Sequence, residues 1–150
     1  MTVTNAEAHR IAREKGVSGP LYLLVKFTAA LVFRLLCGFT ASGKENVPKK
    51  GPVVIVPNHK SFWDPFFVAI VLRRPVHFMG KAEHFEGPMA QFFLRMGAFP
   101  VRRGASDEDA LETARAILRR GDALAMFPEG TRVREEGLRS HDASTRPFRT

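Results

Sequence analysis

The chain has 150 residues, of which 45% are hydrophobic and 25% charged, so its length and apolar content suit one domain with a buried core. Lys and Arg number 23 against 15 Asp and Glu, and the net charge of +8 indicates a polyanionic partner such as a nucleic acid, an anionic membrane or a phosphorylated substrate. The single cysteine, Cys37, excludes an intramolecular disulfide and a multi-cysteine metal site.

Two helices are predicted in the N-terminal third of the chain. Residues 5–15 are good helix formers and end at Gly16. Residues 21–39 are apolar apart from a few positions, among them Lys26 and Arg34, which lie about 80° apart on a helical wheel. This stretch would barely span a bilayer, and its shared cationic face favours a helix lying in a membrane interface, with the two cations toward lipid phosphates. A buried helix of a soluble domain is the alternative.

Short apolar runs alternate with helical patterns from residue 51 onward. Strands are predicted at 53–56, 76–79, 98–101 and 123–127, and helices at 65–74, 88–96 and 106–120. The last helix has the clearest signals, with a capping start at Ser106 and Asp109 and a stop at Gly121. The alternation predicts an α/β fold with a mixed, partly parallel sheet flanked by helices and an N-terminal interfacial helical segment.

The first cluster of reactive side chains, Asn58–Pro65, directly follows a predicted strand. In α/β sheets, functional groups gather at the carboxyl ends of the strands. If the loop turns back, Asp64 meets His59, fixes the tautomer of its imidazole and makes it a general base. Asn58 is expected to hold the turn through backbone hydrogen bonds. The structural alternative is that Asp64 caps the following helix and His59 is a surface loop residue.

Two further clusters follow predicted strands. Phe127–Arg132 combines a tight turn with a carboxylate, Glu129, and a guanidinium, and an arginine binds an anionic oxygen through two hydrogen bonds. Arg102 and Arg103 are paired at the end of another strand, where they suit a phosphate, and Lys81 is a weaker candidate of the same kind. Taken alone, each cluster is also consistent with a solvated turn.

In their order along the chain, these clusters resemble the glycerolipid acyltransferase family, which includes the bacterial 1-acylglycerol-3-phosphate acyltransferases. The family's Asn-His-x4-Asp signature stands here as Asn58–Asp64, and its strand ending in arginine as Gly97–Arg103. The Phe-Pro-Glu-Gly-Thr-Arg signature is complete at Phe127–Arg132. Gly80–Phe85 is similar to the family's Lys-x-Glu-Leu-Phe segment, and the resemblance covers about residues 20–138.

The resemblance implies acyl transfer from acyl-CoA or acyl-carrier protein to the free hydroxyl of lysophosphatidate (1-acylglycerol-3-phosphate), giving phosphatidate. His59 is then the general base, and Asp64 orients it and stabilises its charged form. The residues implied in substrate binding are Asn58, Lys81, Arg102, Arg103, Glu129, Gly130, Thr131 and Arg132. No metal is implied, and no cofactor beyond the acyl thioester, which is a co-substrate.

The resemblance also implies a phospholipid membrane surface as partner, with a lysophospholipid and an acyl thioester as substrates. The expected location is the cytoplasmic face of the cell membrane, as a peripheral or monotopic protein. Residues 1–41 are expected to form a helical membrane-association segment, 42–138 the acyltransferase α/β domain and 139–150 an irregular tail. Because the sequence after residue 138 departs from the family pattern, we expect a C-terminally truncated domain with an exposed sheet edge.

Two other functions compete with this interpretation. The unusual C-terminus leaves open a non-catalytic membrane-surface binding module or an inactive acyltransferase fragment. A nucleic-acid binder would account for the net charge of +8, but 13 Phe against one Trp and one Tyr is an apolar rather than a base-stacking composition. The sequence therefore predicts no nucleic-acid partner, and it leaves the oligomeric state open.

Overall fold

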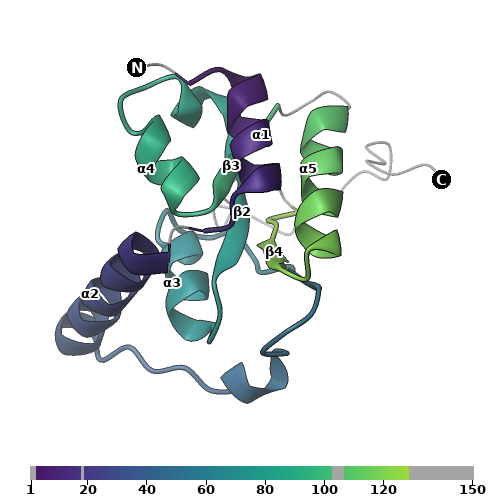
Figure 1. Ribbon diagram of the computed structural model, residues 1–150. Coiled ribbons are helices and arrows are strands. Elements are labelled where there is room, and N and C mark those ends of the chain that lie inside the picture. Colours follow the sequence, from purple (N-terminus) through teal and green to yellow (C-terminus); the bar gives the residue numbers. More distant parts are fainter. Residues whose placement is uncertain (1–2, 18, 103–106, 129–150) are drawn as a thin grey trace, which may run out of the picture.

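Strands and helices alternate through the described part of the chain, which comprises residues 3–17, 19–102 and 107–128 of a computed structural model (Figure 1). In chain order, the elements are α1 (Asn5–Glu14), α2 (Gly19–Cys37), η1 (Lys44–Asn46), β1 (Val53–Ile55), α3 (Asp64–Val71), β2 (Val76–Lys81), η2 (Ala82–Phe85), α4 (Ala90–Arg95), β3 (Ala98–Val101), α5 (Glu108–Arg119) and β4 (Ala123–Ala125). The predicted α/β fold is confirmed.

The four strands form one sheet in the order β1-β4-β2-β3. The sheet was predicted to be mixed, but all three strand pairs among the described residues are parallel. After α5 the chain returns to the middle of the sheet, where β4 lies between β1 and β2. The loops that follow β1 and β4 therefore leave the sheet side by side, at the same carboxyl edge.

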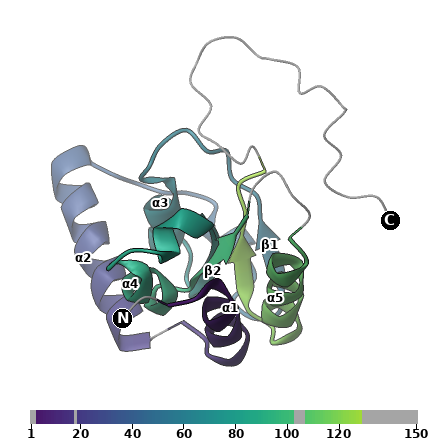
Figure 2. The ribbon, with the colours of Figure 1, turned by 90° about the horizontal axis from the view of Figure 1, so that it is seen from above.

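Helices cover both faces of the sheet (Figure 2). On one face, Ala12 of α1 and Ile117 of α5 pack around Phe99 and Leu124 of the strands. On the other face, Tyr22 of α2 and apolar residues of α3 pack against alternate strand positions, including Ala123. Helix α1 is thus part of a layer that covers the sheet, which its sequence alone did not indicate. The expected boundaries at residues 41 and 138 stay predictions.

Helix α5 illustrates how local signals decide an element. Its N-cap is Asp107, whose carboxylate accepts a hydrogen bond from the N–H of Ala110 at 3.2 Å. The helix therefore starts later than the predicted Ser106, which lies outside the described residues. Its buried stripe includes Thr113 and Ile117, which lie one turn apart: Ile117 packs against the sheet, and the hydroxyl of Thr113 contacts His9 of α1.

Other boundaries moved by a few residues for identifiable reasons. Helix α3 ends at Val71 rather than 74: Leu72 is already extended, with ψ 140°, and its N–H caps the helix on the carbonyl of Val68. Strand β2 continues to Lys81, two residues past its predicted end, because Lys81 pairs in register with Val101 of β3. Gly97 precedes β3 with φ +86°, and a Cβ there would lie 2.7 Å from Val17 Cγ2, so only glycine fits.

Helix α2 leaves most of its surface exposed. By length and composition it could cross a membrane, and only 6% of its apolar window is buried. Its exposed apolar side chains are Leu23, Leu24, Phe27, Leu31, Val32, Leu35 and Leu36. One expectation was wrong: Lys26 does not point toward lipid but donates a hydrogen bond to the carbonyl oxygen of Leu72, at the end of α3. Lys26 thus meets the end of α3, whereas Phe33, which is later in α2, contacts Trp63 at the start of α3, with ring centroids 5.5 Å apart. The two helices therefore run antiparallel.

Candidate functional site

The loop after β1 brings the predicted histidine and aspartate together. His59 Nδ1 lies 3.0 Å from Asp64 Oδ2, although the two residues are five positions apart. Their side chains are 14% and 18% exposed, so both are mostly buried but still reach the surface. Asn58, next to His59 in the loop after β1, is exposed. The geometry of a base and its orienting carboxylate is therefore present at the carboxyl edge of the sheet.

Backbone hydrogen bonds hold this loop closed around Asp64. The same oxygen, Oδ2, accepts the N–H groups of Lys60 and Ser61, both at 2.7 Å. The side chain thus points back into the loop, and the N-cap position of α3 is taken by Trp63 without a side-chain cap. These bonds argue against the alternative in which Asp64 serves only to cap the helix.

The loop keeps Asp64 ionised. Partial burial is the largest single influence on the carboxyl group and raises its pKa, but hydrogen bonds from Ser61, His59 and Lys60 together outweigh it. The pKa of Asp64 is therefore below its ordinary value of 3.8. An ionised carboxylate only accepts hydrogen bonds, so Nδ1 of His59 carries a proton, and in the neutral imidazole Nε2 is the nitrogen with the lone pair.

A phenylalanine from a distant segment packs against the imidazole. The rings of His59 and Phe127 have centroids 4.3 Å apart and planes tilted by 31°. This contact arises because β1 and β4 are neighbours: the N–H of Met126 donates to the carbonyl of Ile55 at 3.0 Å. The sequence shows the motif that contains Phe127 but does not predict this contact, because no local signal indicates that the two strands are neighbours.

Lys81 and Arg102 lie at the same edge, at the ends of β2 and β3. Both line a shallow cavity of about 390 Å³, together with Asn5, Glu83 and Glu86. Lys81 Nζ forms an ion pair with Glu83 Oε1 at 2.9 Å. The two cations that the sequence singled out are therefore neighbours across the β2–β3 pair, but they share their cavity with two carboxylates.

Asp107, which lies at the start of α5, anchors the backbone of Arg102 beside this cavity. Asp107 Oδ2 accepts the backbone N–H of Arg102 at 2.7 Å while its Oδ1 caps α5. The Arg102 side chain is 66% exposed, and its Nε lies 3.8 Å from the same carboxylate. Asp107 thus fixes the backbone at the end of β3 and leaves the guanidinium toward solvent.

The remaining predicted site residues are outside the described part of the chain. They are Arg103, Glu129, Gly130, Thr131 and Arg132, and the structure describes no contact for them. Within residues 3–17, 19–102 and 107–128, no group of three His, Cys, Asp or Glu side chains is arranged to hold a metal ion.

Comparison with known proteins gives consistent matches. A family model described as Acyltransferase matches residues 38–150. The chain is 29% identical to the 1-acyl-sn-glycerol-3-phosphate acyltransferase of Bacillus subtilis over 108 residues, which are 71% of this chain and 54% of the relative. It is 33% identical to the enzyme of that name from Borreliella burgdorferi over 96 residues, 62% of this chain and 38% of the relative.

A third relative is named for a different acceptor lipid. The chain is 34% identical over 120 residues to the lyso-ornithine lipid O-acyltransferase of Pseudomonas aeruginosa, 78% of this chain and 43% of the relative. The chain thus spans about half or less of the length of these three relatives. No solved structure is significantly similar to it. Because the family match covers most of the chain, including the loop that holds His59 and Asp64, the chain belongs to the acyltransferase family.

Proposed function

We propose that the protein transfers an acyl group from acyl-CoA or acyl-carrier protein to the free hydroxyl of lysophosphatidate, giving phosphatidate. The observation that carries this proposal is the 3.0 Å contact between His59 Nδ1 and Asp64 Oδ2. It leaves Nε2 as the basic nitrogen, which is the role that deprotonation of an alcohol requires. The match to the acyltransferase family supports the same reaction class.

In the proposed step, the acceptor hydroxyl gives its proton to His59 Nε2 while its oxygen attacks the thioester carbonyl. The resulting tetrahedral intermediate collapses, the carbon–sulfur bond breaks, and the leaving thiolate takes the proton from the imidazolium. Asp64 stabilises the imidazolium during this cycle and keeps the ring oriented. A thioester is reactive enough that an activated and positioned alcohol suffices, so we propose no metal and no cofactor beyond the acyl thioester.

We propose that the phosphate of the acceptor binds at the Lys81–Arg102 cavity. Both cations line it, and it opens at the same edge of the sheet as His59. Arg103, Glu129, Gly130, Thr131 and Arg132 are proposed to complete this site, on the family resemblance alone, and Asn58 lies beside His59.

We propose that the protein acts at a phospholipid membrane, on its cytoplasmic face. The exposed apolar residues of α2 support the membrane surface, and so do Phe62 and Trp63, which are 54% and 48% exposed in the same loop as His59. Because Trp63 contacts Phe33 of α2, the exposed apolar surface is continuous from the helix to the loop. An interfacial α2 would bring the base to the level at which the lipid substrates reside.

A second candidate acceptor is lyso-ornithine lipid. The similarity to the Pseudomonas aeruginosa enzyme supports it, and so does the composition of the acceptor cavity. Glu83 and Glu86 line that cavity with Lys81 and Arg102, so it holds carboxylates for an ammonium group as well as cations for an anionic group.

The test is a thiol-release assay with acyl-CoA and either lysophosphatidate or lyso-ornithine lipid, presented in vesicles. We expect turnover by the chain and its loss in His59→Ala, with retention in the matched His84→Ala variant, whose imidazole is exposed on η2. Retained transfer in His59→Ala would remove His59 from its role. Vesicle binding without any thiol release would instead favour the non-catalytic membrane-binding alternative.

A further inference from the structure

A second cavity lies at the amino edge of the sheet, opposite the edge that carries His59. It has a volume of about 510 Å³ and is open to solvent. Its walls come from the segments that precede α2, β1, β2 and β4, and three glycines, Gly16, Gly51 and Gly121, contribute backbone to them. The proposed acyl transfer uses none of these residues.

The charged lining of this amino-edge cavity is strongly unbalanced. Four of its side chains are cations, namely Lys49, Lys50, Arg74 and Arg120, and one, Asp122, is a carboxylate. This leaves an excess of three positive charges in one hollow. Cations that converge on a cavity repel one another unless an anion lies between them, so the cavity is electrostatically suited to a negatively charged ligand.

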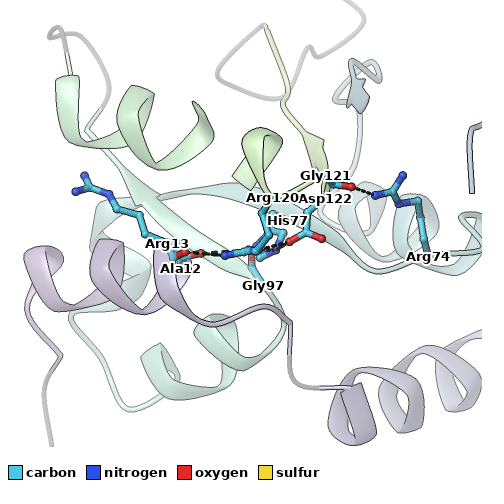
Figure 3. A network of polar contacts seen from close by, with 8 residues as sticks. All are labelled: Ala12, Arg13, Arg74, His77, Gly97, Arg120, Gly121 and Asp122. Atoms are coloured by element: carbon cyan, nitrogen blue, oxygen red, sulfur yellow. Dashed lines mark hydrogen bonds and ion pairs between the residues drawn. The ribbon is translucent and has the colours of Figure 1, made fainter. Parts of the chain in front are cut away.

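Backbone carbonyls hold the two arginines in place. Arg74 donates to the carbonyl of Gly121 at 2.5 Å (Figure 3). It also donates to the carbonyl of Gly51 at 2.6 Å, which joins the turns before β1 and β4. Neutral acceptors fix a guanidinium without cancelling its charge, and Arg74 has no carboxylate partner among the described residues.

Arg120 is the arginine whose charge is balanced. It donates to Asp122 Oδ2 at 2.6 Å and to the carbonyl of Arg13 at the end of α1 at 2.7 Å (Figure 3). Beside it, His77 is 2% exposed and donates from Nδ1 to the carbonyl of Gly97 at 3.1 Å. This polar network, of which His77 is buried and Arg120 and Asp122 are partly exposed, lines the floor of the cavity, and the uncompensated charge lies on the other cations.

The two lysines stand at the mouth of the cavity. Lys49 and Lys50 are exposed and form no hydrogen bond or ion pair with the described residues. Their segment is fixed on both sides, because Arg74 also donates to the carbonyl of Pro48 at 3.3 Å. Two free ammonium groups on an anchored segment can meet a ligand without a large loss of backbone entropy.

We propose that this amino-edge cavity binds a phosphate-bearing anion, held by Lys49, Lys50 and Arg74. Arginine and lysine are the side chains that recognise phosphate oxygens, and the glycine backbone leaves room for the ligand. The phosphate is carried either by a free phosphate compound or by an anionic lipid headgroup. The second source is geometrically open, since Gly16 and Val17 line the cavity and the exposed helix α2 begins at Gly19.

The experiment compares the chain with a double variant, Lys49→Gln/Lys50→Gln, and with a charge-matched control, Lys44→Gln/Arg115→Gln. The control residues are exposed and lie outside the cavity, so it loses the same two charges elsewhere. One arm titrates inorganic phosphate and follows the amide NMR signals of Gly51 and Gly121. The other measures sedimentation with vesicles of phosphatidylcholine, alone or mixed with phosphatidylglycerol.

If the source is a free phosphate compound, inorganic phosphate shifts the two glycine signals saturably in the chain and the control, but not in the double variant. If the source is a lipid, the double variant binds the mixed vesicles about 30-fold more weakly than the chain, which corresponds to about 1 kcal/mol per lysine. Either result supports the site. Equal losses in the double variant and the control, or no response to either probe, would overturn it.

Discussion

The two edges of the sheet both carry charged networks, but they are built differently. At the carboxyl edge, His59 and Asp64 are five residues apart, and one short loop supplies the backbone bonds that orient them. At the amino edge, Arg74 donates to the carbonyl of Gly121, which is 47 residues away in the sequence. Arg120 donates to the carbonyl of Arg13, which is 107 residues away. The candidate catalytic pair is therefore a local structure, whereas the network at the amino edge joins segments that are distant in the sequence.

The two networks also differ in what they leave available. Asp64 and His59 are partly exposed, so a substrate can reach them. His77 and the arginines of the amino edge donate many of their N–H groups to backbone carbonyls of the chain. We therefore expect changes at the carboxyl edge to act on turnover and changes at the buried floor of the amino edge to act on stability.

The largest expected effect comes from Asp64→Asn. The amide would no longer stabilise the imidazolium or fix the proton on Nδ1 of His59, so kcat should fall on the order of 10³-fold or more in the thiol-release assay. The matched control is Asp109→Asn on α5, where a carboxylate pairs with Arg13 at 3.3 Å at the surface. Equal turnover in the two variants would contradict the catalytic reading of the His59 loop.

An intermediate effect is expected on the pH dependence of stability. Burial lowers the pKa of His77 below 6.5, outweighing the opposing effect of Asp122. In the unfolded chain His77 binds a proton near pH 6.5, whereas in the native state it stays neutral until a lower pH. The free energy of unfolding therefore falls as the pH drops from 6.5 toward the native pKa of His77.

Replacing His77 tests this directly. In His77→Asn, the slope of unfolding free energy against pH should be shallower below pH 6.5, by at most about 1.4 kcal/mol per pH unit, as measured by urea denaturation. His9, whose pKa burial also lowers, retains its own contribution in the variant. Parallel slopes in the two proteins would show that His77 is not held neutral.

The smallest expected effect comes from Phe127→Leu. Leucine keeps an apolar side chain beside His59 but removes the ring contact, so kcat should fall about two- to tenfold, as expected for an aromatic pair worth about 0.5–1.5 kcal/mol. The same change at Phe92, whose ring packs against Phe93 at 5.9 Å on α4, serves as control. A loss as large as that of Asp64→Asn would mean that the ring does more than hold the imidazole.

Much of the site was predictable because its parts are close in sequence. The Asn58–Asp64 loop follows a strand, and spacing and residue type predicted a possible His59–Asp64 pair. They left open that Asp64 only caps the following helix, and the structure decides for the pair. The Lys81–Arg102 cavity was predictable in part, since both residues end strands, but the two carboxylates that share it were not identified. Phe127 could not be paired with His59, because nothing local states that β4 lies beside β1.

By itself, the sequence determined the alternation of strands and helices, the amphipathic character of α5 and the residues of the His59 loop. These features depend on apolar spacing and on backbone hydrogen bonds within a few residues, so the local sequence is sufficient to specify them. Only the tertiary structure decided the strand order β1-β4-β2-β3, the packing of α1 beside α5, the inward direction of Lys26 and the network at the amino edge. These depend on which distant apolar faces bury one another, and that choice is made by the free energy of the whole core rather than by any one segment.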